Sequence, residues 1–148
     1  MDKIDKKILN IIQKDFPVVA APFKAIAEKV GLNENEILQR IKHLKDEGII
    51  RRIGAVFDSK KMGFASTLCA AKVPKEYLRK FIEIVNSYPG VTHNYRRRHD
   101  YNVWFTFIAS DEETLKKSLG EIRDKTGVAD IISMTASRIF KIDATFEL

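Results

Sequence analysis

The first fifty residues carry apolar side chains at intervals of three and four in three short segments, the spacing of one helical face. The first segment ends before Pro17, because proline disfavours helical geometry in the residue before it. The second lies between Pro22, which suits a first helical turn, and Gly31, which suits a left-handed cap. The third follows Asn33, which forms a capping-box pattern with Glu36. The spacing therefore predicts three helices joined by tight turns.

An extended run at residues 49–57 follows the third helix. Three helices and such a run describe a winged helix-turn-helix, which we predict as a first domain at residues 1–57. After a connector at residues 58–63 the pattern changes to strand, helix, strand, strand, helix, strand. The predicted elements are a strand at 66–73, a helix opening at Pro74, a hairpin of strands 91–98 and 102–108, a helix from Asp111 to Gly127, and a strand at 130–140.

This βαββαβ order predicts a four-stranded antiparallel sheet with two helices on one face, the ferredoxin-like plan, as a second domain at residues 58–148. The fold class is therefore α+β. The other face of the sheet has no helix to cover it, and an uncovered apolar face is typical of a subunit interface or a ligand site. We expect at least a dimer.

Composition narrows the classes of function. A chain of 148 residues is too short for a large multidomain enzyme, and 45% apolar against 31% charged residues is typical of a folded globule. No apolar run approaches the roughly 20 residues that cross a bilayer, and the N-terminus does not resemble a signal peptide, so we expect a cytoplasmic protein. The net charge of +6 favours an anionic partner. A lone Cys69 excludes an internal disulfide and a cysteine zinc site, and we expect it to be buried.

The densest basic cluster is Arg96, Arg97 and Arg98. It is flanked by His93, Tyr95, His99 and Tyr101. Alternate strand residues share a face, so the row of His93, Tyr95 and Arg97 points one way, and Arg96 and Arg98 point the other. On the next strand, the row of Val103, Phe105 and Phe107 is predicted under the helices and Trp104 on the open face. Which row of the first strand shares the face of Trp104 depends on the hairpin register, which the sequence leaves open.

The domain order resembles the Lrp/AsnC architecture, in which the second module dimerises and binds small effectors. Within that architecture, three strings resemble the siroheme decarboxylases of alternative heme and heme d1 biosynthesis. They are RRIGAVFDSKKMGF at 51–64, STLCAAKVP at 66–74 and PGVTHNYRRRHDYNVWFTF at 89–107. Lrp-type regulators typically carry a glycine just before the Asp-Tyr pair of this hairpin, whereas here His99 precedes Asp100, which argues against a small-amino-acid effector.

The resemblance implies a carboxy-lyase that removes two acetate carboxyl groups from siroheme, giving the didecarboxy product, with no cofactor beyond the iron tetrapyrrole substrate. It also implies a homodimer or a heterodimer with a homologous subunit. Arginine binds carboxylates in a planar, bidentate way, so we expect Arg96, Arg97 and Arg98 to anchor substrate carboxylates, although a solvated basic edge or phosphate contact is the alternative.

An imidazole can ligate iron or deliver protons near neutral pH, so we expect His93 or His99 to ligate the substrate iron or to act as proton donor. Tyr95 is a candidate catalytic residue, and Tyr101 and Trp104 are expected to contact the ring or donate hydrogen bonds. His43, in the third predicted helix, is expected to serve packing or solvent. Nucleotide-binding, metalloprotease and serine-hydrolase motifs are absent from the sequence.

The rival interpretation is a DNA-binding transcriptional regulator of the Lrp/AsnC type, which a helix-turn-helix normally favours. The third predicted helix argues against it. Residues 34–47 hold three basic and four acidic side chains, and the first turn reads Asn-Glu-Asn-Glu, where carboxylates would repel DNA phosphates. We therefore expect operator binding to be lost. A regulator that binds heme in the same pocket without transforming it is a third interpretation.

Overall fold

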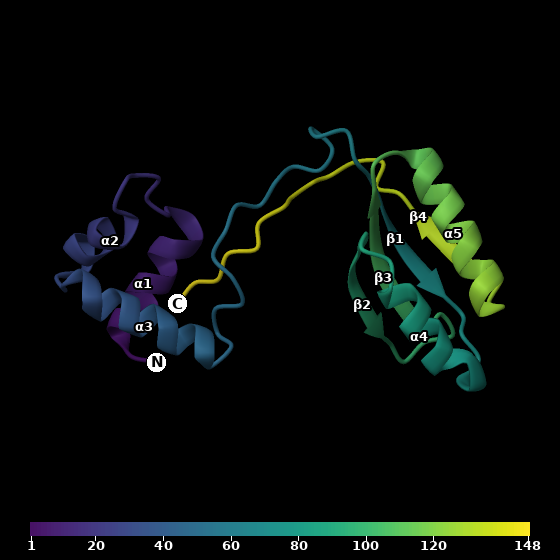
Figure 1. The fold of residues 1–148 in the computed structure, drawn as a ribbon, viewed down its shortest axis with the longest axis horizontal. Coiled ribbons are helices and arrows are strands. Elements are labelled where there is room, and N and C mark those ends of the chain that lie inside the picture. The colour runs from purple at the N-terminus through teal and green to yellow at the C-terminus, as the bar shows by residue number, and fades with distance from the viewer. The chain divides into compact units, whose positions relative to one another are not determined.

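The computed structural model describes all residues 1–148, and the chain divides into two compact units (Figure 1). The first comprises residues 1–56 together with 141–148, and the second comprises residues 57–140. The C-terminal residues differ from the predicted boundary, because 141–148 join the helical unit. Gln13 links them to the first helix, its side chain donating to the carbonyl oxygen of Phe146 at 2.6 Å and accepting from its backbone N–H at 2.9 Å.

The helical unit contains the three predicted helices. They are α1 (Lys3–Lys14), α2 (Pro22–Val30) and α3 (Glu34–Asp46). The expected cap signals form: Asn33 accepts from the backbone of Glu36 in a capping box, and Gly31 ends α2 with a left-handed φ of 77°. The apolar faces meet in one core around Ile8, Ile26 and Leu44, all fully buried. The periodicity predicted these helices because each buries one narrow apolar stripe.

The predicted wing does not form a strand. Residues 50–58 adopt neither helix nor strand, and Val56 and Phe57 expose 89% and 72% of their surface. A β-strand exists only where a neighbour completes its hydrogen-bond ladder, and no segment pairs with this one. The helix-turn-helix is confirmed, whereas its wing is a connector without strand pairing.

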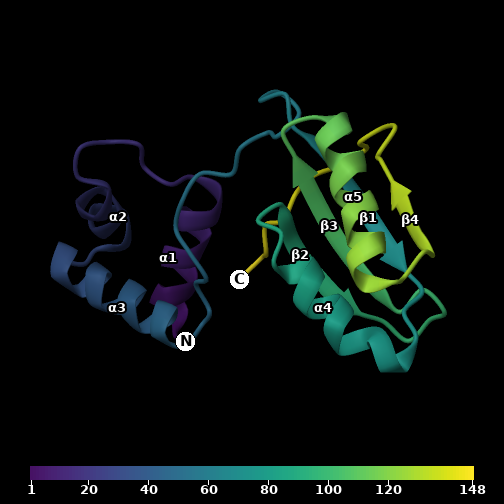
Figure 2. The same ribbon diagram turned by 45° about the vertical axis from the view of Figure 1, so that its right-hand side comes forward.

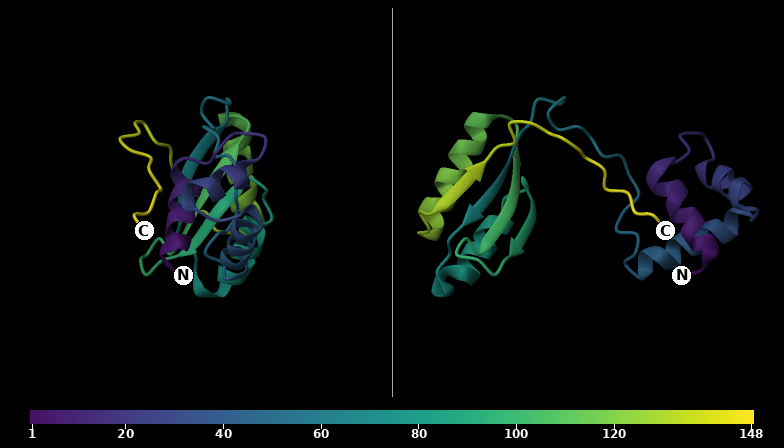
Figure 3. Two further views of the ribbon diagram at one scale, coloured as in Figure 1. Left: turned by 90° about the vertical axis from the view of Figure 1, so that its left-hand side faces the viewer. Right: turned by 180° about the vertical axis from the view of Figure 1, so that it is seen from behind.

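The second unit is the predicted ferredoxin-like fold. Its strands are β1 (Ala65–Ala71), β2 (Val91–Arg96), β3 (Val103–Ala109) and β4 (Ile131–Met134), in the antiparallel order β2-β3-β1-β4. A short 3-10 helix η1 (Lys75–Tyr77) precedes α4 (Leu78–Asn86), and α5 (Glu112–Thr126) follows β3. Figure 2 shows α4 and α5 on the same face of the sheet, and the view from behind in Figure 3 shows the strands of the opposite face.

The core of this unit fills the space between the sheet and its two helices. Phe81 of α4 and Phe105 of β3 meet edge to face at 6.2 Å between ring centroids, and both are fully buried. The alternation of β3 is as predicted, with Val103, Phe105 and Phe107 buried and Trp104 half-buried on the other face. Cys69 is buried, and burial raises the pKa of its thiol to about 12, so it packs as a small apolar residue.

The last strand is shorter than predicted. It ends at Met134 instead of residue 140, and it pairs only with residues 68–71 of β1. The β-prone residues beyond it do not lengthen the strand, because the chain leaves the sheet there and its last eight residues join the helical unit. The uncovered face of the sheet exposes apolar side chains. These include Leu68, Tyr95, Ile132 and Met134.

Candidate functional site

The hairpin register decides which side chains share the open face. Tyr95 lies directly opposite Trp104, and His93 lies opposite Thr106. Residues directly opposite one another in antiparallel strands point to the same face. The row of His93, Tyr95 and Arg97 therefore lies on the open face with Trp104, which settles the alternative that the sequence left open. A bulge between Val91 and His93 precedes this register.

Arg96 has a different environment from its neighbour Arg97. It lies opposite Val103, whose side chain is buried on the side of the helices, so the three arginines do not form a single row. On the same side, the Asn94 side chain donates to the side chain of Asn86 at the end of α4, at 2.8 Å. The arginine side chains at the end of β2 therefore lie on both faces of the sheet.

Trp104 forms a flat platform with its polar atom already satisfied. Its indole N–H donates to the carbonyl oxygen of Tyr101 at 2.7 Å, and the guanidinium of Arg97 lies 5.6 Å from the ring centroid. The Arg97 backbone N–H in turn donates to the carbonyl oxygen of Asn102 at 2.8 Å, which closes the hairpin turn. An aromatic face beside a cation suits a planar ligand that carries acidic groups.

The arginine cluster borders a shallow depression of about 540 Å³. It is lined by Arg96, Arg97, Arg98, His99 and Asn102. None of the three arginines forms an ion pair within the chain. Three exposed guanidinium groups with no carboxylate partner leave their donors available to anionic groups of a ligand.

The two candidate histidines have different hydrogen-bond partners. Nδ1 of His93 lies 3.0 Å from the hydroxyl of Thr92, which can donate or accept, and the His93 ring stacks on Tyr95 at 6.1 Å. Nδ1 of His99 accepts from the backbone N–H of Tyr101 at 3.1 Å, and the two rings stack at 6.3 Å. His43 lies outside this cluster, on α3, where Nε2 is 3.4 Å from the carboxylate of Glu47.

Tyr101 is engaged by a residue that sequence reasoning missed. Its hydroxyl donates to the carboxylate of Asp130 at 2.9 Å, and this hydrogen bond raises the pKa of the Tyr101 hydroxyl. A second missed residue is Asn102, whose side chain accepts from the backbone N–H of Val73 at 2.9 Å and donates to its carbonyl oxygen at 2.8 Å. Both contacts join positions 29 residues apart, so no local pattern signals them.

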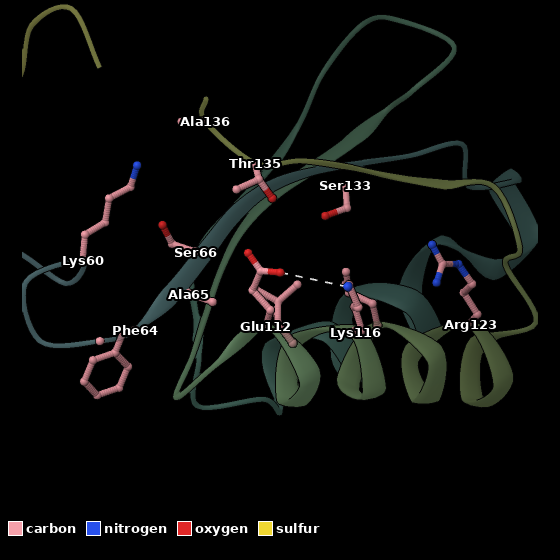
Figure 4. A pocket seen from close by; sticks show the side chains of 13 residues that line it. Lys60, Phe64, Ala65, Ser66, Glu112, Lys116, Arg123, Ser133, Thr135 and Ala136 are labelled. Carbon is pink, nitrogen blue, oxygen red and sulfur yellow. Dashed lines mark ion pairs between the residues drawn. The ribbon is translucent and has the colours of Figure 1, made fainter. Parts of the chain in front are cut away.

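A larger cavity of about 640 Å³ lies elsewhere in the unit, between α5 and the β1–β4 edge of the sheet (Figure 4). Three of its four charged side chains have partners: Lys116 and Glu112 lie 4.0 Å apart, and Arg123 donates to the carbonyl oxygen of Ile131 at 2.9 Å, whereas Lys60 forms no ion pair. It contains none of the predicted site residues. This cavity is the larger of the two, but the arginines without ion-pair partners and the candidate histidines lie at the hairpin. We therefore place the candidate site at the hairpin.

Two further features bear on the class of site. The chain brings no three His, Cys, Asp or Glu side chains together in a way that could hold a metal ion. No helix has the length and apolar character needed to span a membrane.

Comparisons with known proteins identify the family of the chain. Residues 5–51 match the model of the siroheme decarboxylase NirDL-like HTH domain, and residues 61–141 match that of the AsnC-like ligand binding domain. The chain is similar to the siroheme decarboxylase alpha subunit of Desulfovibrio desulfuricans, with 47% identity over 148 residues, covering all of this chain and 85% of that protein.

Solved structures extend the comparison. The siroheme decarboxylase NirDL, crystallised in co-complex with an iron-uroporphyrin III analogue, is 39% identical with a TM-score of 0.72, covering 88% of this chain and 43% of that one. An AsnC family transcriptional regulator from Agrobacterium tumefaciens has a TM-score of 0.78 at 27% identity, covering 99% of this chain and 96% of that one. The fold is thus common to enzymes and regulators, whereas the higher identities lie with the enzymes. The chain belongs to the siroheme decarboxylase family, built from a NirDL-like helix-turn-helix domain and an AsnC-like ligand-binding domain.

Proposed function

We propose that the protein is a siroheme decarboxylase, or one subunit of such an enzyme, and acts as a carboxy-lyase. The observation that carries this proposal is a single hairpin that holds three arginines without ion-pair partners, two imidazoles and Trp104, with Arg97 over the indole ring. Siroheme is a planar iron macrocycle fringed with carboxylates, and this combination of side chains matches it. The related NirDL structure holds an iron-uroporphyrin analogue, a ligand of the same chemical class.

The reaction sets clear demands on the site. For each acetate group, the bond between the methylene carbon and the carboxyl carbon breaks, carbon dioxide leaves, and a proton joins the methylene carbon to give a methyl group. The electron pair of the broken bond ends in the new C–H bond, so the step is redox-neutral. The site must therefore hold the carboxylates and supply one proton for each carbon dioxide released.

The arginines meet the first demand. Arg97 lies on the same face as Trp104, so it can hold a carboxylate at the edge of a ring stacked on the indole. Arg96 and Arg98 line the neighbouring depression and anchor further carboxylates in this proposal. Fixing several carboxylates at once orients the reacting acetate, and orientation is a major source of rate enhancement.

The histidines meet the second demand. An imidazole, that of His93 or His99, ligates the substrate iron or supplies protons, and Tyr95, stacked on His93 and 53% exposed, contacts the ring. In this proposal the product is the didecarboxy macrocycle, a compound of heme biosynthesis.

We propose that a second, homologous subunit or a second copy covers the rest of the open sheet face. The name of the Desulfovibrio relative, an alpha subunit, supports such an assembly. The exposed Leu68, Ile132 and Met134 lie on this face and would be buried by a partner. The candidate site, on the same face, would then border the subunit interface.

Anaerobic incubation with siroheme followed by mass spectrometry tests the activity. Loss of two carbon dioxide masses supports the decarboxylase, and binding without a mass change supports the heme-responsive regulator. The measurement is made on the protein alone and after mixing with a homologous subunit. Activity that requires the mixture identifies the heteromeric form, and an unchanged substrate in both samples contradicts the proposal.

The regulator interpretation rests on the helix-turn-helix, and the structure gives observations against it. Arg40 of α3 is bound by Asp2 and Asp5 at 2.8 and 2.7 Å, and Lys42 by Asp46 at 2.8 Å. These pairs neutralise cations that DNA phosphates would need. We propose that the helical unit is a scaffold that has lost operator binding. Tight sequence-specific retardation of DNA in a mobility-shift assay at low salt would support the interpretation as a DNA-binding regulator.

A further inference from the structure

The turn between β2 and β3 is held at two points outside the hairpin. The Asn102 side chain forms paired hydrogen bonds with both backbone groups of Val73, which follows β1. The Tyr101 hydroxyl donates to Asp130, whose own carbonyl oxygen accepts from the backbone N–H of Lys72. Two consecutive residues of the turn are therefore fastened to segments distant in the sequence.

These hydrogen bonds hold the turn in a conformation in which the backbone N–H of Tyr101 faces the ring of His99. That N–H donates to Nδ1 of His99 at 3.1 Å, and the stacked rings, inclined by 23°, keep the imidazole in place. A ring nitrogen that accepts a hydrogen bond carries no proton of its own, so the neutral imidazole must carry its proton on Nε2. A protonated Nε2 is a hydrogen-bond donor and has no lone pair for a metal.

We infer that Tyr101, Asn102 and Asp130 are positioning residues that fix His99 in its Nε2–H tautomer, which makes His99 a hydrogen-bond donor toward a substrate carboxylate and leaves iron ligation to His93. The division of roles rests on the proposed function; the tautomer does not. His93 meets the requirement for a ligand, because the hydroxyl of Thr92 can accept a hydrogen bond from Nδ1–H, which leaves the lone pair of Nε2 free.

The tautomer is measured directly on the full-length protein by proton–nitrogen correlation NMR, above the pH at which the imidazoles are protonated. His43→Gln and His93→Gln variants assign the resonances. The expected spectrum shows His99 as the Nε2–H form, and Tyr101→Phe shifts it toward a mixture of both forms. The matched control Tyr77→Phe, an exposed tyrosine of η1, leaves the spectrum of His99 unchanged. A predominant Nδ1–H form in the unmodified protein overturns the inference.

Turnover and ligand spectra test the division of roles. Tyr101→Phe is expected to lower kcat roughly tenfold, the cost of a slightly displaced catalytic group, with KM nearly unchanged. Absorption spectra with bound iron uroporphyrin are expected to lose the imidazole-ligated form in His93→Ala and to retain it in His99→Ala. Loss of that form in His99→Ala overturns the assignment.

Asn102 is tested by two variants, because removal of its amide can also unfold the turn. Asn102→Ala is expected to mix the tautomers of His99, whereas Asn102→Asp keeps the acceptor for Val73 and retains more of the Nε2–H form. If both variants remain folded by circular dichroism and keep the original tautomer, Asn102 has no positioning role. If the protein shows the expected tautomer but does not convert siroheme, the proposed function fails while the positioning of His99 stands.

Discussion

The two units of the molecule treat arginine in opposite ways. In the helical unit, Arg40 is half-buried and bound by the carboxylates of Asp2 and Asp5. In the sheet unit, Arg96, Arg97 and Arg98 are exposed and have no carboxylate partner in the chain. The first arginine joins α3 to the capping box of α1, and the other three remain available to a ligand. Whether an arginine stabilises the fold or is available to a ligand therefore depends on whether a carboxylate of the same chain pairs with it.

The largest effect is expected when one imidazole of the sheet unit, that of His99, is removed. His99→Ala is expected to lower decarboxylation about 100-fold, because the substrate loses a positioned hydrogen-bond donor. His43→Ala is the matched control, since this histidine lies on α3 beside Glu47 and should leave turnover unchanged. The readout is the rate of carbon dioxide release from siroheme. Equal rates in His99→Ala and the unmodified protein would show that the reaction does not use the His99 imidazole.

Substitutions of the arginines are expected to have smaller effects, on KM in the sheet unit and on the melting temperature in the helical unit. Arg97→Ala is expected to raise KM for siroheme roughly tenfold, the value of a charge-assisted hydrogen bond, without lowering the melting temperature. Arg97→Lys should not restore affinity, because an ammonium group lacks the planar fork. Arg40→Ala should lower the melting temperature and leave KM unchanged. A reversal of these two outcomes would break the comparison between the units.

Acid titration tests the structural role of the Asp2 carboxylate, which caps α1. The backbone N–H of Asp5 and, next, the guanidinium of Arg40 lower the pKa of Asp2 below its ordinary value of 3.8. A carboxylate whose folded pKa is depressed stabilises the fold above its unfolded pKa, and this stabilisation is lost as the pH falls through the folded value. Unfolding followed by circular dichroism should therefore show a loss of stability below about pH 3.8 that is smaller in Asp2→Asn. An identical acid dependence in both proteins would exclude this contribution.

The smallest effect is expected for the exposed ion pair of α3. Lys42 and Asp46 lie 2.8 Å apart, one helical turn from each other, and both side chains are largely exposed. Such pairs contribute little to stability, so Lys42→Ala should leave the melting temperature and turnover within error of the unmodified protein. If the same substitution abolished a mobility shift on DNA, the helical unit would be a DNA-binding domain after all.

Local patterns were sufficient where an element is stabilised by its own neighbours in sequence. The cap at Asn33 and the left-handed Gly31 follow from spacing because each involves contacts within a few residues, and the alternation of β3 follows from the two-residue period of a strand. The wing at 49–57 and the length of β4 did not follow, because a strand depends on a partner elsewhere in the chain. The β-prone composition of these segments therefore overstated the extent of pairing.

The same distinction holds in the candidate site. The sequence by itself determined that arginines, histidines and tyrosines gather on one hairpin, since they are consecutive or alternate along it. Only the tertiary structure decided that the His93 row shares a face with Trp104, and that Asp130 and Val73 hold the turn that presents His99. The physical reason is that strand register and side-chain hydrogen bonds depend on the distance between segments in space, which folding sets and local spacing does not encode.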